Sequence, residues 1–324
     1  MNRRITRRRF GQLVIAGSAG AGLVYFANKT LAQTPNLVIF GISSGRITTT
    51  SNTPNPPVNN STVSSNIAPT ATASTSLSLI LQSLDVTTGQ IKTVNTFEFL
   101  ADGSTPILQS NEELSAFTAL ANGTLVVAIT PVSGSKNETD SARLTVLGAS
   151  PTSMPLSGLN QGEKLDSFVG TNDGGLIGLV LQKSSKPPVR LVNINLQTGA
   201  ITANNTVTLP ADQRFTTLVH CPADGKLYTI TTAQDGNTSL VQLDQAQHQP
   251  IIVLKQLTFN GKIWNSGLES LVCSGSGQFL ALGAPRYVTP NSVYNVDAGN
   301  GTLTALTQFN VSKVTIGSAT PNLG

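Results

Sequence analysis

The sequence predicts an all-β fold in which five small antiparallel sheets close into a ring. Short runs with alternating apolar and polar residues, separated by Gly, Asp and Asn turns, indicate antiparallel strands. These runs recur in units of about 51 residues. The first unit lacks its inner strand, and one strand is left over at the C-terminal end.

One complete unit occupies residues 216–251. Its strands have five or six residues, and a tight turn, Pro222–Gly225, joins the first two. The four strands are expected at Thr217–Cys221, Lys226–Thr231, Ser239–Asp244 and Pro250–Leu254.

The unit repeats with little variation in length. The turn glycine before each second strand falls at intervals of 51, 51 and 52 residues, at Gly123, Gly174, Gly225 and Gly277. The strands before these turns match in pattern: Leu114–Phe117, Leu165–Phe168, Phe215–Leu218 and Leu268–Leu271. Third strands end in turns such as Asp85–Gly89 and Asn195–Gly199, where the Asp or Asn side chain caps the turn and Gly adopts positive φ. A four-stranded unit of this length is typical of a β-propeller blade.

Counting strands predicts five blades and the way the ring closes. The first copy lacks an inner strand: Leu37–Ile42 has the character of a second strand, Leu77–Leu84 of a third and Ile91–Phe99 of an outer one. Lys313–Ser318 is left over at the other end, and pairing it beside Leu37–Ile42 completes the first blade. Such closure removes exposed sheet edges. The predicted fold is thus a five-bladed β-propeller closed by its N- and C-terminal strands.

The blade ends of the form Asp-x-x-Thr-Gly resemble those of β-propeller repeat proteins in general. The resemblance covers residues 33–324 as a single domain, but it indicates no specific family. It also implies no active site, because a fold does not determine a function.

Residues 1–32 are predicted to be a twin-arginine signal peptide. Arg7, Arg8, Arg9 and Phe10 follow a threonine in the order of that motif, and a moderately apolar run extends over Leu13–Ala27. Small residues before position 33 offer a cleavage site. The expected location is periplasmic or otherwise exported. The alternative is an uncleaved anchor, and only then is a membrane contact expected.

The export signal also accounts for the basic charge of the chain. It holds six of the twenty Lys and Arg residues and none of the sixteen Asp and Glu residues, so residues 33–324 carry a formal charge of −2. This charge excludes the clustered basic surface that nucleic-acid binding needs.

Residues 44–76 interrupt the first blade. Ser, Thr, Asn and Pro dominate this segment, and its few apolar residues are isolated. Such a composition cannot bury enough surface to offset the entropy of ordering, so a disordered insertion is predicted. The alternative is a stalk, a glycan-bearing arm or a partner-binding loop.

The longer connections are expected on one face of the ring, which is therefore the face to search for function. Trp264, Arg286, Tyr287 and Glu269 belong to the fifth blade there and offer an aromatic pair, a cation and a carboxylate for a sugar or planar ligand. In the alternative interpretation, Trp264 covers the edge of the blade and Arg286 pairs with Glu269.

Further charged residues begin or precede the inner strands. They are Glu112, Glu113, Asp166, Asp212, Arg214 and Glu269. Convergent carboxylates on a propeller axis are the arrangement that glycosidases use as acid and base or nucleophile. Solvated strand ends are the alternative, and few aromatic residues are present to form a sugar platform.

No metal site and no cofactor are predicted, because the two histidines, His220 and His248, have no ligand spacing. Cys221 and Cys273 lie on adjacent inner strands. If blade four is aligned through Phe215 and Leu218, the thiols face each other and a disulfide is possible. If it is aligned through the turn glycine, they face the same way and no bond forms.

The leading functional prediction is an exported binding or interaction module that presents its loop-rich face to an unknown small molecule, glycan or protein. The alternative is a glycan-active or lactone-type hydrolase on the same face. At least two carboxylates or a bound metal at the mouth of the axial channel would favour the enzyme.

Overall fold

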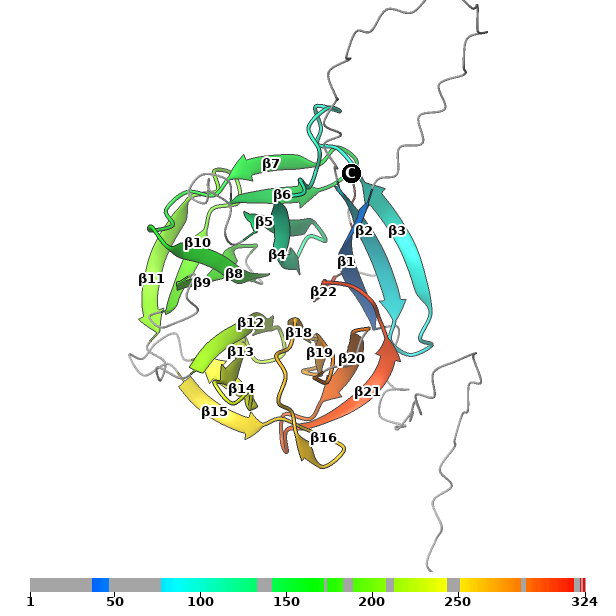
Figure 1. Cartoon of the computed structure of the whole chain (residues 1–324), viewed down its shortest axis with the longest axis vertical. Coiled ribbons are helices and arrows are strands. Elements are labelled where there is room, and N and C mark those ends of the chain that lie inside the picture. The colour runs from blue at the N-terminus through cyan, green and yellow to red at the C-terminus, as the bar shows by residue number, and fades with distance from the viewer. Residues whose placement is uncertain are drawn as a thin grey trace, which may run out of the picture.

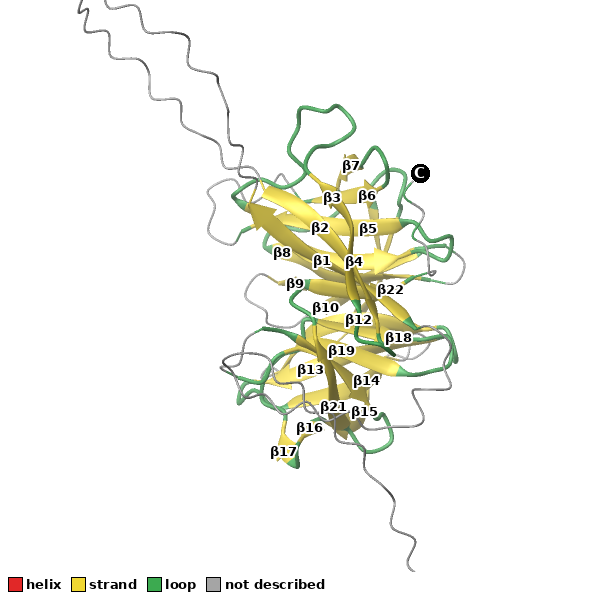
Figure 2. Ribbon diagram, turned by 90° about the vertical axis from the view of Figure 1, so that its right-hand side faces the viewer, coloured by secondary structure: helices red, strands yellow, loops and turns green. Residues whose placement is uncertain are grey.

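The computed structural model has the predicted all-β architecture, with five small sheets around a central axis (Figure 1). It describes residues 37–46, 77–132, 142–171, 174–182, 189–207, 213–243, 251–286, 290–317, 321 and 323. Seen from the side, the described elements are strands joined by loops and turns (Figure 2). The fold is a five-bladed β-propeller. Within the described residues, no helix is long and apolar enough to cross a membrane.

Each blade is an antiparallel sheet whose first strand lies nearest the axis. From the axis outward, blade 1 contains β22 (Lys313–Ile316), β1 (Val38–Arg46), β2 (Leu77–Asp85) and β3 (Ile91–Phe97). Blade 2 contains β4 (Glu112–Ala119), β5 (Leu125–Pro131), β6 (Arg143–Leu147) and β7 (Thr152–Pro155). Blade 3 contains β8 (Glu163–Gly170), β9 (Leu176–Gln182), β10 (Val189–Ile194) and β11 (Ile201–Val207).

The last two blades follow the same order. Blade 4 contains β12 (Gln213–Cys221), β13 (Lys226–Ala233), β14 (Thr238–Leu243) and β15 (Ile251–Gln256). Blade 5 contains β18 (Ser270–Cys273), β19 (Phe279–Gly283), β20 (Ser292–Val296) and β21 (Thr302–Gln308). A short hairpin of β16 (Thr258–Phe259) and β17 (Lys262–Ile263) extends this sheet, because β16 pairs in parallel with β21. The sequence does not predict this hairpin, since two-residue strands have no periodicity.

The predicted closure of the ring is confirmed. β22 pairs antiparallel with β1, with Gly41 opposite Val314, and the two strands lie side by side in red and blue (Figure 1). Gly41 is required here because a Cβ atom would lie 2.6 Å from the buried ring of Phe309. The two ends of the chain therefore complete one blade.

Apolar side chains fill the space between every pair of neighbouring blades. Five separate clusters of buried residues occupy these spaces, and each joins strands of two blades. The second strand of each blade is apolar and buried on both faces, as in β5, β13 and β19. The core is thus a ring around the axis.

The inner strands of blades 2, 3 and 4 share a β-bulge at one position. The register with the second strand shifts between Leu114 and Ala116, between Leu165 and Ser167, and between Phe215 and Thr217. A bulge adds a residue and redirects neighbouring side chains. These bulges lie beside the site described below.

The first strand is longer than predicted. Ser44, Gly45 and Arg46 continue β1 and pair with Leu79, Ser78 and Leu77, so they are not part of an insertion. The isolated polar residues conceal this end of the strand, because its partner supplies the apolar side chains. Residues 47–76, like the predicted signal peptide, lie outside the described residues, and both interpretations stay predictions.

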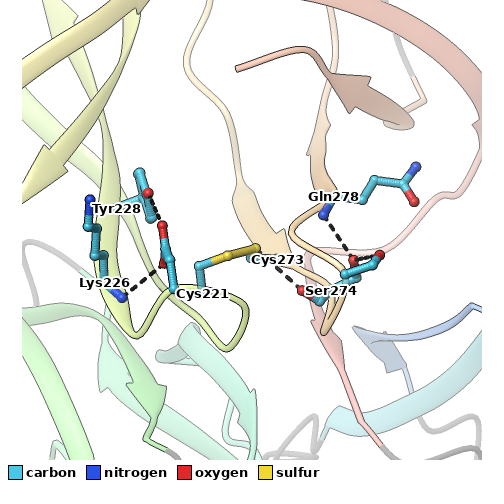
Figure 3. Close-up of a disulfide and its surroundings, with 8 residues drawn as sticks. Cys221, Lys226, Tyr228, Cys273, Ser274 and Gln278 are labelled. Carbon is cyan, nitrogen blue, oxygen red and sulfur yellow. Dashed lines mark hydrogen bonds between the residues drawn. A yellow bond between two sulfur atoms is a disulfide. The ribbon is translucent and has the colours of Figure 1, made fainter. Parts of the chain in front are cut away.

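Cys221 of β12 and Cys273 of β18 form a disulfide that joins the inner strands of blades 4 and 5 (Figure 3). Their Cα atoms are 5.0 Å apart. β12 continues to Cys221 opposite Lys226, whereas β18 ends at Cys273 opposite Phe279. Cys221 therefore matches Ser274 in its distance from the buried leucine of its strand, which is the first of the two predicted alignments. Disulfides persist in oxidising compartments, so the bond is compatible with export.

Candidate functional site

A cavity of about 640 Å³ lies on the axis of the ring, at the end where the long connections leave the blades. Its size is within the range of small-molecule sites. Residues next to the long connections line it, including Ser44 at the end of β1 and Thr130 near the end of β5. Six charged residues line it: Glu113, Lys164, Asp166, Arg214 and Lys313 on the inner strands of blades 1 to 4, and Glu269 just before β18 of blade 5.

The repeat explains how these side chains reach the axis. In the inner strands of blades 2, 3 and 4, two cavity-lining residues flank an apolar residue, as Lys164 and Asp166 flank buried Leu165. Successive side chains in a strand point to opposite faces. The same triplet brings Arg214 to the axis in blade 4 and Glu269 in blade 5, beside buried Phe215 and Leu268.

The charges lie close to one another. The Lys164 ammonium is 3.9 Å from a carboxylate oxygen of Asp166. Lys313 Nζ donates a hydrogen bond of 3.0 Å to the Glu269 carbonyl oxygen and is 3.7 Å from the carboxylate of the same residue. Cations and carboxylates therefore alternate around the cavity, so a ligand can meet both kinds of group.

The pKa of Asp166 is raised by its surroundings in this cavity. Removal of the group from water disfavours its charged form and raises its pKa from 3.8 to about 6, with a further contribution from the charge of Glu269. Lys164, Lys313 and Arg214 act in the opposite direction but do not outweigh the burial. About one fifth of the side chain is exposed, so it remains in contact with the cavity. A carboxyl group with this pKa can both give and take a proton near neutral pH.

Hydroxyl groups line the deeper part of the axis. Ser167, Thr216 and Thr217 each have a buried side-chain oxygen without a hydrogen-bond partner among the described residues. Thr216 borders the large cavity, and Ser167 and Thr217 border a constriction of about 30 Å³ below it. Buried polar atoms are normally paired with protein, water or ligand. The three oxygens lie beneath the floor of the large cavity and have almost no accessible surface.

A second, smaller cavity of about 230 Å³ lies at the opposite end of the axis. His220 and Thr315 are among its polar residues, while much of its wall is apolar or glycine. None of the residues that line it is Asp, Glu, Lys or Arg. The polar chemistry of the described chain is therefore concentrated at the loop-rich end.

The structure brings four of the predicted site residues together. Glu113, Asp166, Arg214 and Glu269 all border the large cavity. Glu112 does not: its carboxylate is buried and accepts hydrogen bonds from Arg143, including one of 2.8 Å from Nη2. Asp212 and His248 lie outside the described residues.

The predicted aromatic cluster of blade 5 is not a ligand platform in the structure. Trp264 is only 3% exposed and packs edge-on against Tyr294, with ring centroids 5.2 Å apart, in the core between blades 4 and 5. The missed hairpin explains this burial, because Trp264 follows β17 directly and its backbone N–H bonds to Leu257. Arg286 is on an exposed turn that does not border the large cavity, and Tyr287 lies outside the described residues.

Sequence reasoning missed Lys164 and Lys313. Lys164 occupies the same place in its strand as Glu113 and Arg214, so the alignment of the repeats contained the signal. Lys313 comes from the C-terminal strand that completes blade 1, and its place at the axis follows only from the closure.

Among the described residues, no group of three or more His, Cys, Asp or Glu side chains is arranged to hold a metal ion. The basic side chains beside Asp166 and Glu269 instead supply positive charge from the protein itself.

No protein-family model matches the sequence, and no curated protein matches it significantly. Solved structures resemble the chain in fold. A gluconolactonase from Xanthomonas campestris is 10% identical with a TM-score of 0.42, over 72% of this chain and 73% of that one. A luciferin-regenerating enzyme is 13% identical with a TM-score of 0.39, over 76% and 80% of the two chains. AofleA from Arthrobotrys oligospora is 12% identical with a TM-score of 0.44, over 75% and 72%. These likenesses concern the propeller fold and transfer no residue role.

Proposed function

We propose that the axial cavity binds a small polyhydroxylated molecule with an anionic group, such as a sugar acid. The observation that carries this proposal is the convergence of Lys164, Arg214 and Lys313 with three carboxylates in one cavity. Charge-assisted hydrogen bonds to an anion are about twice as strong as neutral ones.

The remaining lining residues match the rest of such a molecule. Glu113, Asp166 and Glu269 are acceptors for ligand hydroxyl groups, because ionised carboxylates only accept hydrogen bonds. Serine, threonine and asparagine side chains can either donate or accept, and several border the cavity: Ser43, Ser44, Ser115, Thr130, Thr216, Asn291, Asn310 and Ser312. A neutral, apolar ligand would leave these polar groups unpaired.

Calorimetric titration tests the proposal. Glucuronate should bind the folded protein, and glucose should bind at least tenfold more weakly, because it lacks the anionic group. Lys164→Met and Arg214→Met should each weaken glucuronate binding about tenfold or more, since a hydrogen bond to a charged group contributes about 1.5–3 kcal/mol. Lys226→Met, which removes an exposed lysine of β13 outside the cavity, is the matched control. Equal binding by all variants, or no glucuronate binding, would contradict the proposal.

A second candidate is hydrolysis of the corresponding lactone, and the observation that favours it is Asp166. This carboxyl group has a pKa of about 6 and lies beside the basic side chains of the cavity. It would take a proton from water as the water oxygen attacks the lactone carbonyl carbon. Lys164, Lys313 or Arg214 would stabilise the oxyanion. The ring C–O bond then breaks, and the same proton passes to the leaving oxygen. The product is a sugar acid.

Hydrolysis of gluconolactone, corrected for the spontaneous reaction, distinguishes the two candidates. A catalysed rate that rises with pH through about 6 and disappears in Asp166→Asn would support the enzyme. Asp235→Asn, in the exposed turn before β14, is the control. Glucuronate binding without any catalysed hydrolysis would favour the binding protein over the hydrolase.

A further inference from the structure

A side groove of about 390 Å³ lies between blades 2 and 3 at the same end of the ring. It shares Glu113, Thr130 and Lys164 with the axial cavity, so the two spaces adjoin along these side chains. The residues that line the groove are those three together with Pro131, Ala142, Leu156 and the loop Ser157–Glu163. A molecule bound on the axis therefore has a lateral space next to it.

Hydrogen bonds of Glu163 and Arg190 fix the loop that forms one wall of the groove. Glu163 accepts hydrogen bonds from the Arg190 guanidinium, with Oε1 2.8 Å from Nε, and from the backbone N–H of Asn160. Arg190 also bonds to the Gly158 carbonyl oxygen at 3.3 Å. Burial alone would raise the pKa of Glu163, but these hydrogen bonds and the charge of Arg190 outweigh it and lower the pKa. The carboxylate is thus fixed by the protein and holds the loop in place.

The same Glu–Arg arrangement occurs between blades 1 and 2, so residues of the two connections can be matched to each other. There Glu112 pairs with Arg143, accepts from the backbone of Gln109, and Arg143 bonds to the Ile107 carbonyl oxygen at 2.8 Å. Ile107 and Leu108 consequently correspond to Gly158 and Leu159.

The two connections differ in the side chains that they place beside the Glu–Arg pair. Ile107 and Leu108 are 0% and 1% exposed and belong to the core between blades 1 and 2. At the equivalent place, Gly158 has no side chain and Leu159 remains half-buried. The backbone at Ser157 bonds instead to Gly199 and Ile201 of blade 3. This replacement leaves the groove between blades 2 and 3 open.

We infer that the ligand is elongated, with its anionic sugar-like part on the axis and an aliphatic segment in the side groove. This inference rests on the proposed function. Pro131, Ala142, Leu156 and Leu159 offer the apolar wall for such a segment. The charged groups of the groove are either shared with the axial cavity or, as in Glu163, already paired. No aromatic residue lines the groove within the described chain, which favours a flexible chain over a second stacked sugar ring.

Alkyl β-glucuronides of increasing length test the inference by calorimetry. In the wild-type protein, hexyl glucuronide should bind at least tenfold more tightly than methyl glucuronide, because each buried methylene strengthens binding several-fold. Leu159→Glu places a carboxylate in the groove and should reduce this ratio to less than threefold. Both glucuronides carry the same anionic group, so any effect of the new carboxylate on the axial site cancels in this ratio.

Two controls separate the possible failures. Ile252→Glu changes a half-exposed residue of β15 in the same way and should keep the wild-type ratio. Affinity that is independent of chain length, or a ratio that Leu159→Glu leaves unchanged, would overturn the elongated ligand while the axial site stands. If no glucuronide of any length binds, the axial site proposed above fails as well.

Discussion

The interface between blades 1 and 2 and the interface between blades 2 and 3 are built on one plan but are filled differently. Both have a buried Glu–Arg pair that fixes the incoming connection, Glu112 with Arg143 and Glu163 with Arg190. The first connection adds buried Ile107 and Leu108, whereas the second leaves a groove of about 390 Å³.

The two interfaces share the ion pairs that hold their connections in place but differ in the apolar side chains beside those pairs. The ion pairs hold the loops in both interfaces, so the loop that borders the groove is as firmly braced as the one that closes its neighbour. An apolar pair that would fill the space is present in one and missing in the other. We interpret the first interface as a structural joint and the second as part of the ligand site.

The largest effect is expected where an interface is lost altogether. Truncation after Phe309 removes β22, exposes the paired edge of β1 and deletes buried Val311 and Val314. The loss should be comparable to the whole stability of a domain, about 5–15 kcal/mol, so the protein should aggregate or remain unfolded. Solubility and thermal melting measure this. A soluble monomer with the wild-type melting curve would show that β22 does not close the ring.

A pair of matched substitutions tests the difference between the two interfaces. Ile107→Ala removes a fully buried side chain and should cost about 2–5 kcal/mol of unfolding free energy. Leu159→Ala removes a half-buried side chain beside an existing groove and should cost less than about 1 kcal/mol. Urea unfolding measures both values. Equal costs would mean that the groove wall is packed as tightly as the joint.

A further effect on stability concerns Asp166 and depends on pH. Its folded-state pKa of about 6 is above the ordinary 3.8, so between these values the folded protein keeps a proton that the unfolded chain releases. Stability is therefore lost as pH rises, and above pH 6 the cost reaches about 3 kcal/mol. Asp166→Asn should be more stable than wild type by up to that amount at pH 7.5 and nearly equal to it at pH 4. Urea titrations at both values check this. A variant that is less stable at pH 7.5 would refute the assignment.

Much of the fold follows from local patterns. The turn glycines at intervals of 51 or 52 residues, with the missing inner strand of the first unit and the extra C-terminal strand, predicted the blade number and the closure. These signals come from strand period and turn chemistry, which are local properties. The convergence of Glu113, Asp166 and Glu269 was also a prediction, since equivalent positions of a repeat meet at the axis.

Tertiary contacts decided the rest. Trp264 had the appearance of a loop residue, but a hairpin too short to have a pattern carries it into the core. The disulfide depended on a one-residue alignment that the strand pairing resolves. The side groove depends on how the connections 98–111 and 156–162 pack against the neighbouring blades, and no sequence periodicity predicts that packing.

A crystal structure of the protein soaked with glucuronate tests the central claim most directly. The sugar carboxylate should lie within hydrogen-bond distance of at least one of Lys164, Arg214 and Lys313, with sugar hydroxyls on Glu113, Asp166 or Glu269. Glucuronate bound elsewhere, with the axial cavity holding only water at a saturating concentration, would contradict the assignment of this cavity as the ligand site.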